Sequence, residues 1–317
     1  MQKTKECKYI PIKSVLRIIE KQPYHWHDSL TIVKVIRGMI KVRAWAYDNF
    51  LKQGDFIILN IGEIHEISGI TKDNLVSITY IDACYCKKIL PNFEYMIIFC
   101  NSSKYEFMHS YKYSILRKYI DELINSLINN SFQQSEITDI NIKKLFSFLS
   151  ENFDYVTCGI KLKKFSKKVS ERNRQLYKSV ILLDGEYNYF SLKDIADHIG
   201  VNYNYLKQDV VKRYGYGYKW LKHTIMIENA VKMILLTNDP IIYIGEICGF
   251  SAPQYMIKYF KAYFNCTPSQ FRSLYRNNYA RECKYEEFPL NSNTVIRNNI
   301  NDLFYDVSSH ITTNYGD

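Results

Sequence analysis

The chain has 317 residues, of which 47% are hydrophobic and 23% are charged. At roughly 150 residues per domain, this length favours two domains, and the composition excludes both a disordered chain and a fibrous one. No stretch reaches the 18 or more apolar residues of a membrane span, and the N-terminal sequence lacks the apolar core of a signal peptide. We therefore expect a soluble, cytoplasmic protein with no membrane partner, whose eight cysteines stay reduced.

The net charge of +10 is concentrated in one part of the chain. Residues 161–284 hold 21 Lys and Arg against 10 Asp and Glu, whereas the remainder is close to neutral. A basic block of this kind favours a polyanionic partner. Nucleic acid is the stronger expectation, because no basic amphipathic membrane anchor accompanies the charge.

Residues 23–82 have the pattern of short strands separated by turns. Residues 40–44 alternate between apolar and basic side chains, as in a strand with one buried face, and residues 56–59 form an apolar run typical of a strand buried on both faces. A compact β-barrel or sandwich follows. The expected turns include those at Gly38, Gly54 and Gly62.

From about Tyr111 the apolar residues recur with the period of a helix, and a second helix is expected after the polar turn 129–134. Two helices in this position either cap the barrel or pair two protomers. The apolar stripe on the first helix is wider than one barrel face needs, so both interpretations stay open. The Lys-rich segment that follows is expected to be a linker.

Residues 191–211 carry a helix–turn–helix pattern. Ser191 and Asp194 form a capping box, Ala196 is small where a second helix crosses, and Gly200 supplies the turn. Asn202 caps the next helix. The outward face of that helix is expected to present Asn204, Lys207, Gln208 and Val211.

The same pattern returns about 49 residues later. Gly245 takes the small crossing position, Gly249 the turn and Ser251 the cap. The outward face of the second helix is expected to present Gln254, Lys258 and Lys261. Amide and cationic side chains of this kind bind base edges and phosphates, so both patterns predict DNA recognition helices.

Residues 218–236 are predicted to form one continuous helix between the two patterns. At about 1.5 Å per residue its length is roughly 28 Å, close to the ~34 Å between successive major-groove entries on one face of B-DNA. One rigid helix is therefore expected to hold both recognition helices in consecutive grooves.

Over about residues 172–276 the sequence resembles the AraC/XylS family of bacterial transcription regulators. The most specific segments are residues 244–251, 259–261 and 267–272. The resemblance implies two units that insert into adjacent major grooves of promoter DNA, and activation through contact with RNA polymerase. The predicted DNA-contacting residues are Asn202, Asn204, Lys207, Gln208, Val211, Ser251, Gln254, Lys258 and Lys261.

Residues 25–27, 54–55 and 62–65 resemble the paired motifs of the cupin barrel, which many members of the family use to bind an effector. His25 and His27 are expected on one face of a strand, and His65 is expected to join them. The predicted effector pocket consists of His25, His27, His65 and Trp45. Three imidazoles are able to hold a transition metal, but Thr31 stands where a carboxylate ligand is expected. We therefore favour a hydrogen-bonding pocket without metal or cofactor over a metal site.

The sequence thus predicts an α+β two-domain protein: a cupin-like barrel with dimerisation helices, and an all-α double helix–turn–helix domain. The predicted boundaries are 1–156 for the barrel part, 157–171 for the linker, 172–280 for the DNA-binding domain and 281–317 for a tail without an assigned role.

We expect a DNA-binding transcription regulator that is controlled by an unidentified small molecule and is dimeric through helices near residues 111–150. The family resemblance implies that it is an activator. An effector-independent architectural DNA-binding protein is the main alternative. A metal-dependent cupin enzyme is a weaker one, because the chain has no GxxxxGK[ST], GxSxG or HExxH motif and no catalytic residue is predicted.

Asp209 departs from the family pattern, because this position is usually apolar. Its negative charge beside DNA phosphates predicts that the first unit binds DNA less firmly than the second. Replacing Asp209 with Leu should therefore increase DNA affinity, as measured by fluorescence anisotropy at a fixed salt concentration. An affinity that stays the same or falls would contradict this explanation.

Overall fold

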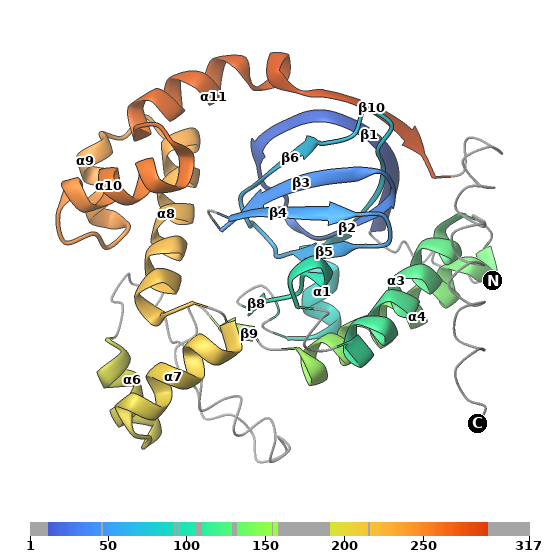
Figure 1. The fold of residues 1–317 in the computed structure, drawn as a ribbon, viewed down its shortest axis with the longest axis horizontal. Helices are drawn as coiled ribbons and strands as arrows, with labels where there is room; N and C mark the ends of the chain where they lie inside the picture. Colours follow the sequence, from blue (N-terminus) through green and yellow to red (C-terminus); the bar gives the residue numbers. More distant parts are fainter. Residues whose placement is uncertain are drawn as a thin grey trace, which may run out of the picture.

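The computed structural model describes residues 12–45, 47–91, 93, 96–105, 110–128, 132–153, 155–157, 191–214 and 216–290. Figure 1 shows an antiparallel, barrel-like sheet with a pair of helices packed against it. The C-terminal helices form an arc around one side of this barrel, and the last strand of the arc lies on the barrel itself (Figure 1). Among these residues no helix is both long enough and apolar enough to cross a bilayer.

The barrel is one sheet in which the strands follow the order β4-β3-β6-β1-β7-β2-β5, with β10 added to β1. All pairs within it are antiparallel. Its strands are β1 (Ile12–His25), β2 (Ser29–Arg37), β3 (Met39–Ala44), β4 (Tyr47–Lys52), β5 (Phe56–Leu59), β6 (His65–Gly69), β7 (Leu75–Asp82) and β10 (Lys284–Pro289).

The turn signals of the sequence account for the connections between these strands. Gly38, Gly54 and Gly62 all have positive φ, a conformation that glycine adopts without the steric penalty of a Cβ atom. The predicted alternation in β3 and the fully buried β5 are both confirmed. The barrel begins earlier than expected, at Ile12, because the basic and acidic side chains of β1 interrupt its apolar pattern.

Two helices close one side of the barrel: α3 (Ser110–Ile128) and α4 (Phe132–Asn152). Leu116 and Ile120 of α3 share a buried core with Leu16 and Phe56 of the barrel, which confirms the capping interpretation. Helix α4 begins at Phe132, inside the segment expected to be a turn. The smaller elements beside these helices are α1 (Ala83–Ile89), α2 (Ser102–Tyr105), β8 (Met96–Ile98) and β9 (Tyr155–Thr157).

The C-terminal domain is helical, as predicted. Its elements are α6 (Leu192–Ile199), α7 (Tyr203–Tyr214), α8 (Tyr218–Leu236), α9 (Ile241–Ile247), α10 (Pro253–Phe264) and α11 (Pro268–Glu282). The bounds of α8 are those expected from the sequence. The predicted linker lies outside the described residues except for Thr157, which belongs to β9 instead.

The arc contacts the barrel at two places. Near the start of α8, Tyr216 stacks on Tyr47 of the barrel with 4.9 Å between ring centroids, and on Trp220 with 4.0 Å. At the other end, Tyr24 of β1 packs edge-on against Phe264 of α10, with 4.9 Å between the ring centroids. The aromatic contacts therefore attach both halves of the C-terminal domain to the barrel.

The segment after α11 is not a separate tail, and the expectation for residues 281–290 needs correction. It continues as β10, which pairs with β1 over the register from Val15↔Pro289 to Lys21↔Lys284. Leu290 at its end is buried in the barrel core. We call residues 284–290 the C-terminal strap. It is an element of the barrel sheet that follows the DNA-binding helices in sequence.

Candidate functional site

The first helix–turn–helix unit, α6 with α7, forms as its sequence predicts. Ser191 Oγ accepts the Asp194 backbone N–H and the Asp194 carboxylate accepts the Ser191 N–H, which completes the capping box. Ala196 is fully buried where the helices cross, and Gly200 ends α6 in the left-handed conformation. Asn202 Oδ1 accepts the backbone N–H groups of the first turn of α7. The side chain predicted to contact DNA here is therefore also a cap.

Helix α7 separates an inward face from an outward one. Leu206 and Val210 are buried against α6 and α8. The predicted contact residues Asn204, Lys207, Gln208 and Val211 are all exposed. The sequence interpretation missed Tyr205, which is 60% exposed at the start of the same helix. An aromatic side chain at an exposed helix position is the signal that marks it, since a ring of this kind adds contact area to a DNA interface.

The second unit, α9 with α10, repeats this arrangement. Gly245 lies against Met256 where the helices cross, and a Cβ atom at this position would make an ordinary van der Waals contact with Met256 Sδ, at 3.5 Å. Gly249 makes the turn with a φ of 82°. The predicted cap at Ser251 is wrong: the N-cap is Ala252, no side chain caps the helix, and Pro253 occupies the first turn. Proline lacks one of the N–H groups that the start of a helix leaves unpaired, and the Tyr255 N–H donates to the Ala252 carbonyl oxygen instead of to a side chain.

Helix α10 also presents the predicted polar face. Met256 and Phe260 are fully buried, whereas Gln254, Lys258 and Lys261 are exposed, as is Ser251 in the turn before the helix. Asn265 ends the helix in the left-handed conformation, with a φ of 55°. Asparagine tolerates this conformation better than most side chains do.

Helix α8 lies between the two units, with α7 near its N-terminal end and α10 near its C-terminal end (Figure 1). Arg272 of α11 stabilises the C-terminal end of α8 and the segment after it. Its guanidinium donates to the carbonyl oxygens of Ile234 and Asp239, at 3.1 and 2.7 Å. Both recognition faces point away from their own cores, and one 19-residue helix fixes their separation. This geometry is suited to simultaneous contact at two places on a long polymer.

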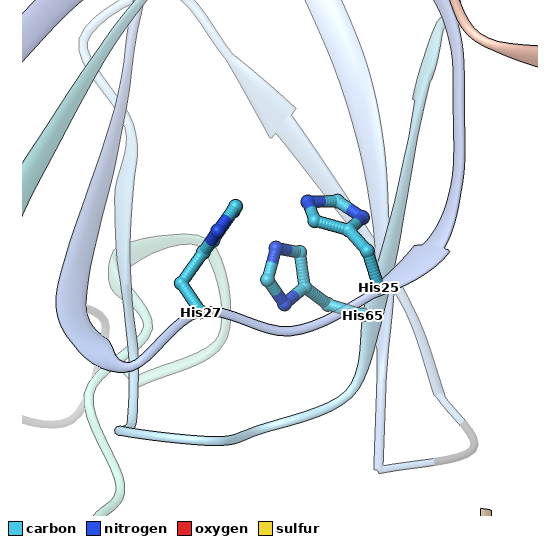
Figure 2. A group of neighbouring side chains, drawn as sticks. All are labelled: His25, His27 and His65. Carbon is cyan, nitrogen blue, oxygen red and sulfur yellow. The ribbon is translucent and has the colours of Figure 1, made fainter. Parts of the chain in front are cut away.

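The second candidate site is a cluster of three histidines, His25, His27 and His65, inside the barrel (Figure 2). The ring centroids are 4.7 Å apart for His25 and His27, and 4.2 Å apart for His25 and His65. His25 is the last residue of β1, but His27 lies beyond the strand end, so the expectation of one shared strand face is wrong. The irregular backbone after His25 brings the rings together instead.

All three histidines are neutral at physiological pH. Burial lowers the pKa of His25 to about 3, with a further contribution from His27, and burial beside Arg17 lowers the pKa of His27 to about 4. Burial holds the pKa of His65 well below its ordinary value. The Nδ1 atoms of His25 and His65 donate to backbone carbonyls of Pro23 and Glu63, so their Nε2 atoms are the acceptors.

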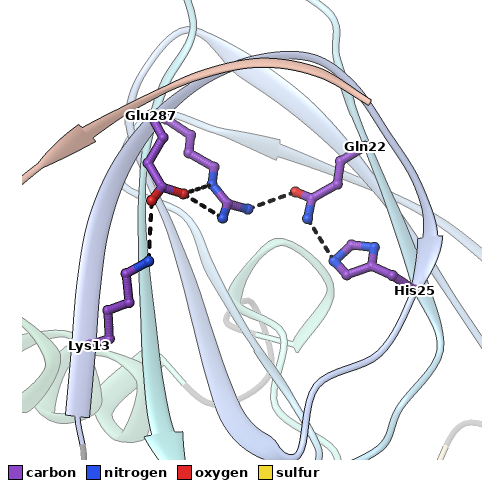
Figure 3. A network of polar contacts seen from close by, with 5 residues as sticks. Lys13, Gln22, His25 and Glu287 are labelled. Atoms are coloured by element: carbon purple, nitrogen blue, oxygen red, sulfur yellow. Dashed lines mark hydrogen bonds and ion pairs between the residues drawn. The ribbon is translucent and has the colours of Figure 1, made fainter. Parts of the chain in front are cut away.

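A polar network connects this cluster to the C-terminal strap (Figure 3). Glu287 of the strap accepts two bonds from Arg17, at 2.9 and 2.6 Å. Arg17 donates to Gln22 Oε1 at 3.0 Å, and the Gln22 amide donates to His25 Nε2 at 2.8 Å. Sequence analysis missed Arg17 and Gln22, because it did not place a strand over residues 12–22.

Trp45 is not part of the histidine cluster, although the sequence assigned it to the same pocket. Its ring lies 5.6 Å from that of Phe99 and 5.9 Å from that of Trp220, at the contact between the barrel and α8. Its indole N–H donates to the Glu63 carboxylate. Trp45 is therefore part of the contact between the barrel and the C-terminal domain.

A pocket of about 470 Å³ opens beside the histidines. Its lining is polar, and the Tyr80 hydroxyl in it is buried without a hydrogen-bond partner among the described residues. The Tyr80 ring lies 4.8 Å from that of His27. The lining consists of Ile12, Lys13, Arg17, His27, Asp28, Ser29, Tyr80 and Asp82.

The histidines are a poor ligand set for a metal as they stand. Their nearest ligand atoms lie within 4.8 Å of one another, but Gln22 already occupies Nε2 of His25. No carboxylate belongs to the group among the described residues, and the Thr31 hydroxyl at the expected ligand position lies 3.4 Å from that of Ser29. Metal-bound imidazoles need free nitrogen atoms about 2.0–2.1 Å from the ion. The arrangement favours hydrogen bonding to a small molecule.

Comparison with known proteins gives an independent view of the C-terminal part. A family model described as a helix-turn-helix domain matches residues 195–273. The porin thermoregulatory protein EnvY of Escherichia coli (strain K12) is 27% identical over 84 residues, which cover 26% of this chain and 33% of EnvY. The match thus spans about a third of that relative.

Two solved structures are also similar. ToxT from Vibrio cholerae O395 matches over 83% of this chain and 98% of its own, at 16% identity and a TM-score of 0.39. The C-terminal domain of the response regulator yesN from Fusobacterium nucleatum matches over 26% of this chain and 81% of its own, at 28% identity and a TM-score of 0.25. The family model covers both helix–turn–helix units and the helix that joins them.

The depressed pKa of His25 predicts acid sensitivity of the fold. The unfolded chain binds a proton at His25 near pH 6.5, whereas the folded protein does so only near pH 3. The stability that depends on neutral His25 is therefore complete above pH 6.5 and is lost as the pH falls below it. Between pH 7 and pH 4 this loss should reach about 3 kcal/mol.

The measurement is the free energy of unfolding by urea, for the unmodified chain and for His25→Gln, at both pH values. The variant lacks the titrating group, so its disadvantage at pH 7 should shrink by that amount at pH 4. A difference between the two proteins that is independent of pH would contradict the assignment.

Proposed function

We propose that this member of the AraC/XylS family is a one-component transcription regulator. Its double helix–turn–helix domain binds promoter DNA, its barrel binds a small-molecule effector, and two protomers pair. The observation that carries the proposal is the placement of two exposed polar faces, on α7 and α10, beside one helix that belongs to both cores.

The chemistry of these faces supports sequence-specific binding. Gln208 and Gln254 are exposed amides of the kind that pair bidentately with adenine, and Lys207 and Lys258 are cations that bind guanine or phosphate. The 19 residues of α8 span about 28 Å, which approaches the ~34 Å repeat of B-DNA. We infer that the two units enter successive major grooves on one side of the duplex.

The proposal that the barrel binds an effector is supported by the groups that line its pocket. Neutral His27, the Tyr80 hydroxyl and Arg17 line a pocket that offers both hydrogen-bond donors and acceptors. The barrel contacts both halves of the DNA-binding domain, so a ligand that changes the barrel surface changes how the two units are presented. By family resemblance we propose an activator that contacts RNA polymerase.

An architectural protein that coats DNA without an effector is the competing function. It would bind through phosphates alone, whereas a regulator also reads bases. Scrambling one promoter half-site should reduce the affinity of a regulator by about 1–3 kcal/mol per altered base pair. An architectural protein should lose little.

Two substitutions on α10 distinguish base recognition from phosphate binding. Gln254→Ala should relax the preference at one base pair while affinity for scrambled DNA stays unchanged. Lys258→Ala should act likewise if it contacts a base. If it binds phosphate, it should weaken binding to all sequences and reduce the salt slope by about one unit.

Affinity for the promoter duplex and its scrambled version, measured over a range of salt concentrations, separates these cases. Lys72→Ala is the control, because this lysine is exposed in the turn between β6 and β7 of the barrel, outside the recognition helices and the helix pair. Equal and small effects of both α10 variants on both duplexes would contradict the role of α10 as a recognition helix.

The proposed dimer uses the side of the helix pair that faces solvent. Ile137 and Ile140 of α4 are 47% and 51% exposed, and Tyr111 of α3 is 78% exposed. Ile137 and Ile140 are three residues apart and share a face of the helix. Ile140→Glu should place a charge in the interface and convert the dimer to a monomer in sedimentation experiments.

Lys193→Glu, a charge reversal at an exposed position of α6 outside the helix pair, is the control. Circular dichroism shows whether each variant is folded. A mass that is the same for Ile140→Glu and the unmodified chain would remove this surface from the proposal.

A further inference from the structure

The C-terminal strap holds the end of the DNA-binding domain on the barrel. Its strand β10 forms an antiparallel ladder with β1, and Leu290 anchors its end in the core. Ion pairs flank the ladder, between Glu282 and Lys21 at 2.5 Å and between Lys284 and Glu20 at 3.2 Å. Because β10 follows α11 with one intervening residue, any movement of the strap is passed to the second helix–turn–helix unit.

Glu287 is the residue through which the strap reaches the pocket. Its carboxylate accepts two bonds from the buried Arg17 guanidinium and one from Lys13 at 3.2 Å. Arg17 and Lys13 both line the pocket beside the histidines. In Figure 3 the Glu287 carboxylate lies between these two cations. The protein therefore already contains a carboxylate bound at this site by charge-assisted bonds.

Arg17 and Lys13 form the cationic part of this pocket. Among the described residues, Glu287 is the carboxylate that accepts hydrogen bonds from both. Arg17 is otherwise held by Gln22 and by the Tyr285 ring, whose centroid lies 4.3 Å from its guanidinium carbon. The pocket lining also includes two acidic residues. One of them, Asp82, caps α1, because its carboxylate accepts N–H groups of the first turn of that helix. Asp28 remains as the acidic group of the lining without a capping role.

We propose that the pocket binds a small-molecule carboxylate, and that Glu287 is its built-in competitor, which the ligand displaces from Arg17 and Lys13. The inference rests on the proposed function in one respect, the assignment of the effector to this pocket. It adds the chemical class of the ligand and the element that responds to it.

Displacement loosens the strap for an electrostatic reason. Once a ligand carboxylate occupies Arg17 and Lys13, Glu287 loses its partners and is repelled by the ligand. The remaining attachments are the backbone ladder, the two flanking ion pairs, the contact of Arg17 with the Tyr285 ring, and Leu290. A charge-assisted pair of this kind contributes enough to change the fraction of open strap roughly tenfold. The Arg17–Gln22–His25 network connects the same event to the histidine cluster.

Hydrogen–deuterium exchange on the full chain tests this proposal without DNA, so its outcome is separate from that of the regulator hypothesis. The probe is sodium acetate, with acetamide as the neutral analogue and sodium chloride to hold the ionic strength constant. Acetate should increase the exchange rate of the backbone amides of residues 284–288, by up to roughly tenfold at saturation. Acetamide should not.

Variants of the strap make the test specific. Glu287→Gln removes the competing charge, so its strap amides should exchange faster without any probe, and acetate should add little. Glu286→Gln is the matched control, because it is the adjacent carboxylate of the same strand and points to the other face of the sheet. This control should respond to acetate as the unmodified chain does.

Lys13→Ala provides a second test that does not endanger the fold, because the Lys13 side chain is mostly exposed. It should raise the acetate concentration needed for half of the effect. The proposal is overturned if acetate and acetamide act alike, or if acetate accelerates strap exchange equally in Glu287→Gln and in the unmodified chain.

Discussion

Helix α8 is the constraint on which the rest of the C-terminal domain depends. Its first half belongs to the core of the first unit through Leu221 and Ile225, and its second half to the core of the second unit through Ile227, Val231 and Ile234. One continuous set of backbone hydrogen bonds therefore fixes the distance between α7 and α10. A flexible connection would have to order itself on DNA, at the expense of affinity. The rigid helix removes that loss.

The barrel touches both halves of this rigid domain, and its contact is of mixed character. Aromatic rings pack against each other across it, as at Tyr24 and Trp45. The same interface also buries the carboxyl groups of Glu63 and Glu228, and burial raises the pKa of each, to about 7 and about 8. Groups of this kind are better solvated when the domains separate. The contact is therefore weaker than a domain core of equal area.

The helical domain was predictable because local signals decide it. Capping residues, left-handed glycines and apolar residues with a period of 3.6 mark α6 to α10. Each of these signals lies within a few residues of the feature that it predicts. Where a signal was ambiguous, the structure differs: Pro253 starts α10 without a side-chain cap, so Ser251 has no capping role.

The barrel site was predictable only in part, because its remaining members are brought in by long-range pairing. The residues of β10 alternate poorly and include three charges, so the strand forms only because β1 offers unpaired backbone groups. Arg17 and Glu287 are 270 residues apart and meet through this register. No local pattern in either segment indicates the other. For the same reason Trp45 was placed with the histidines, although α8 is its real neighbour.

These differences in how the elements are held also determine which of them can move. The strap is attached by exposed ion pairs, a six-residue edge strand, the buried Arg17 pair and one core side chain, that of Leu290. Helix α8 is held by two hydrophobic cores, and truncating a single core side chain there would remove about 2–5 kcal/mol. Local opening follows the weakest attachments. The strap is therefore the attachment that opens more readily, while α8 keeps the spacing of the two helix–turn–helix units fixed.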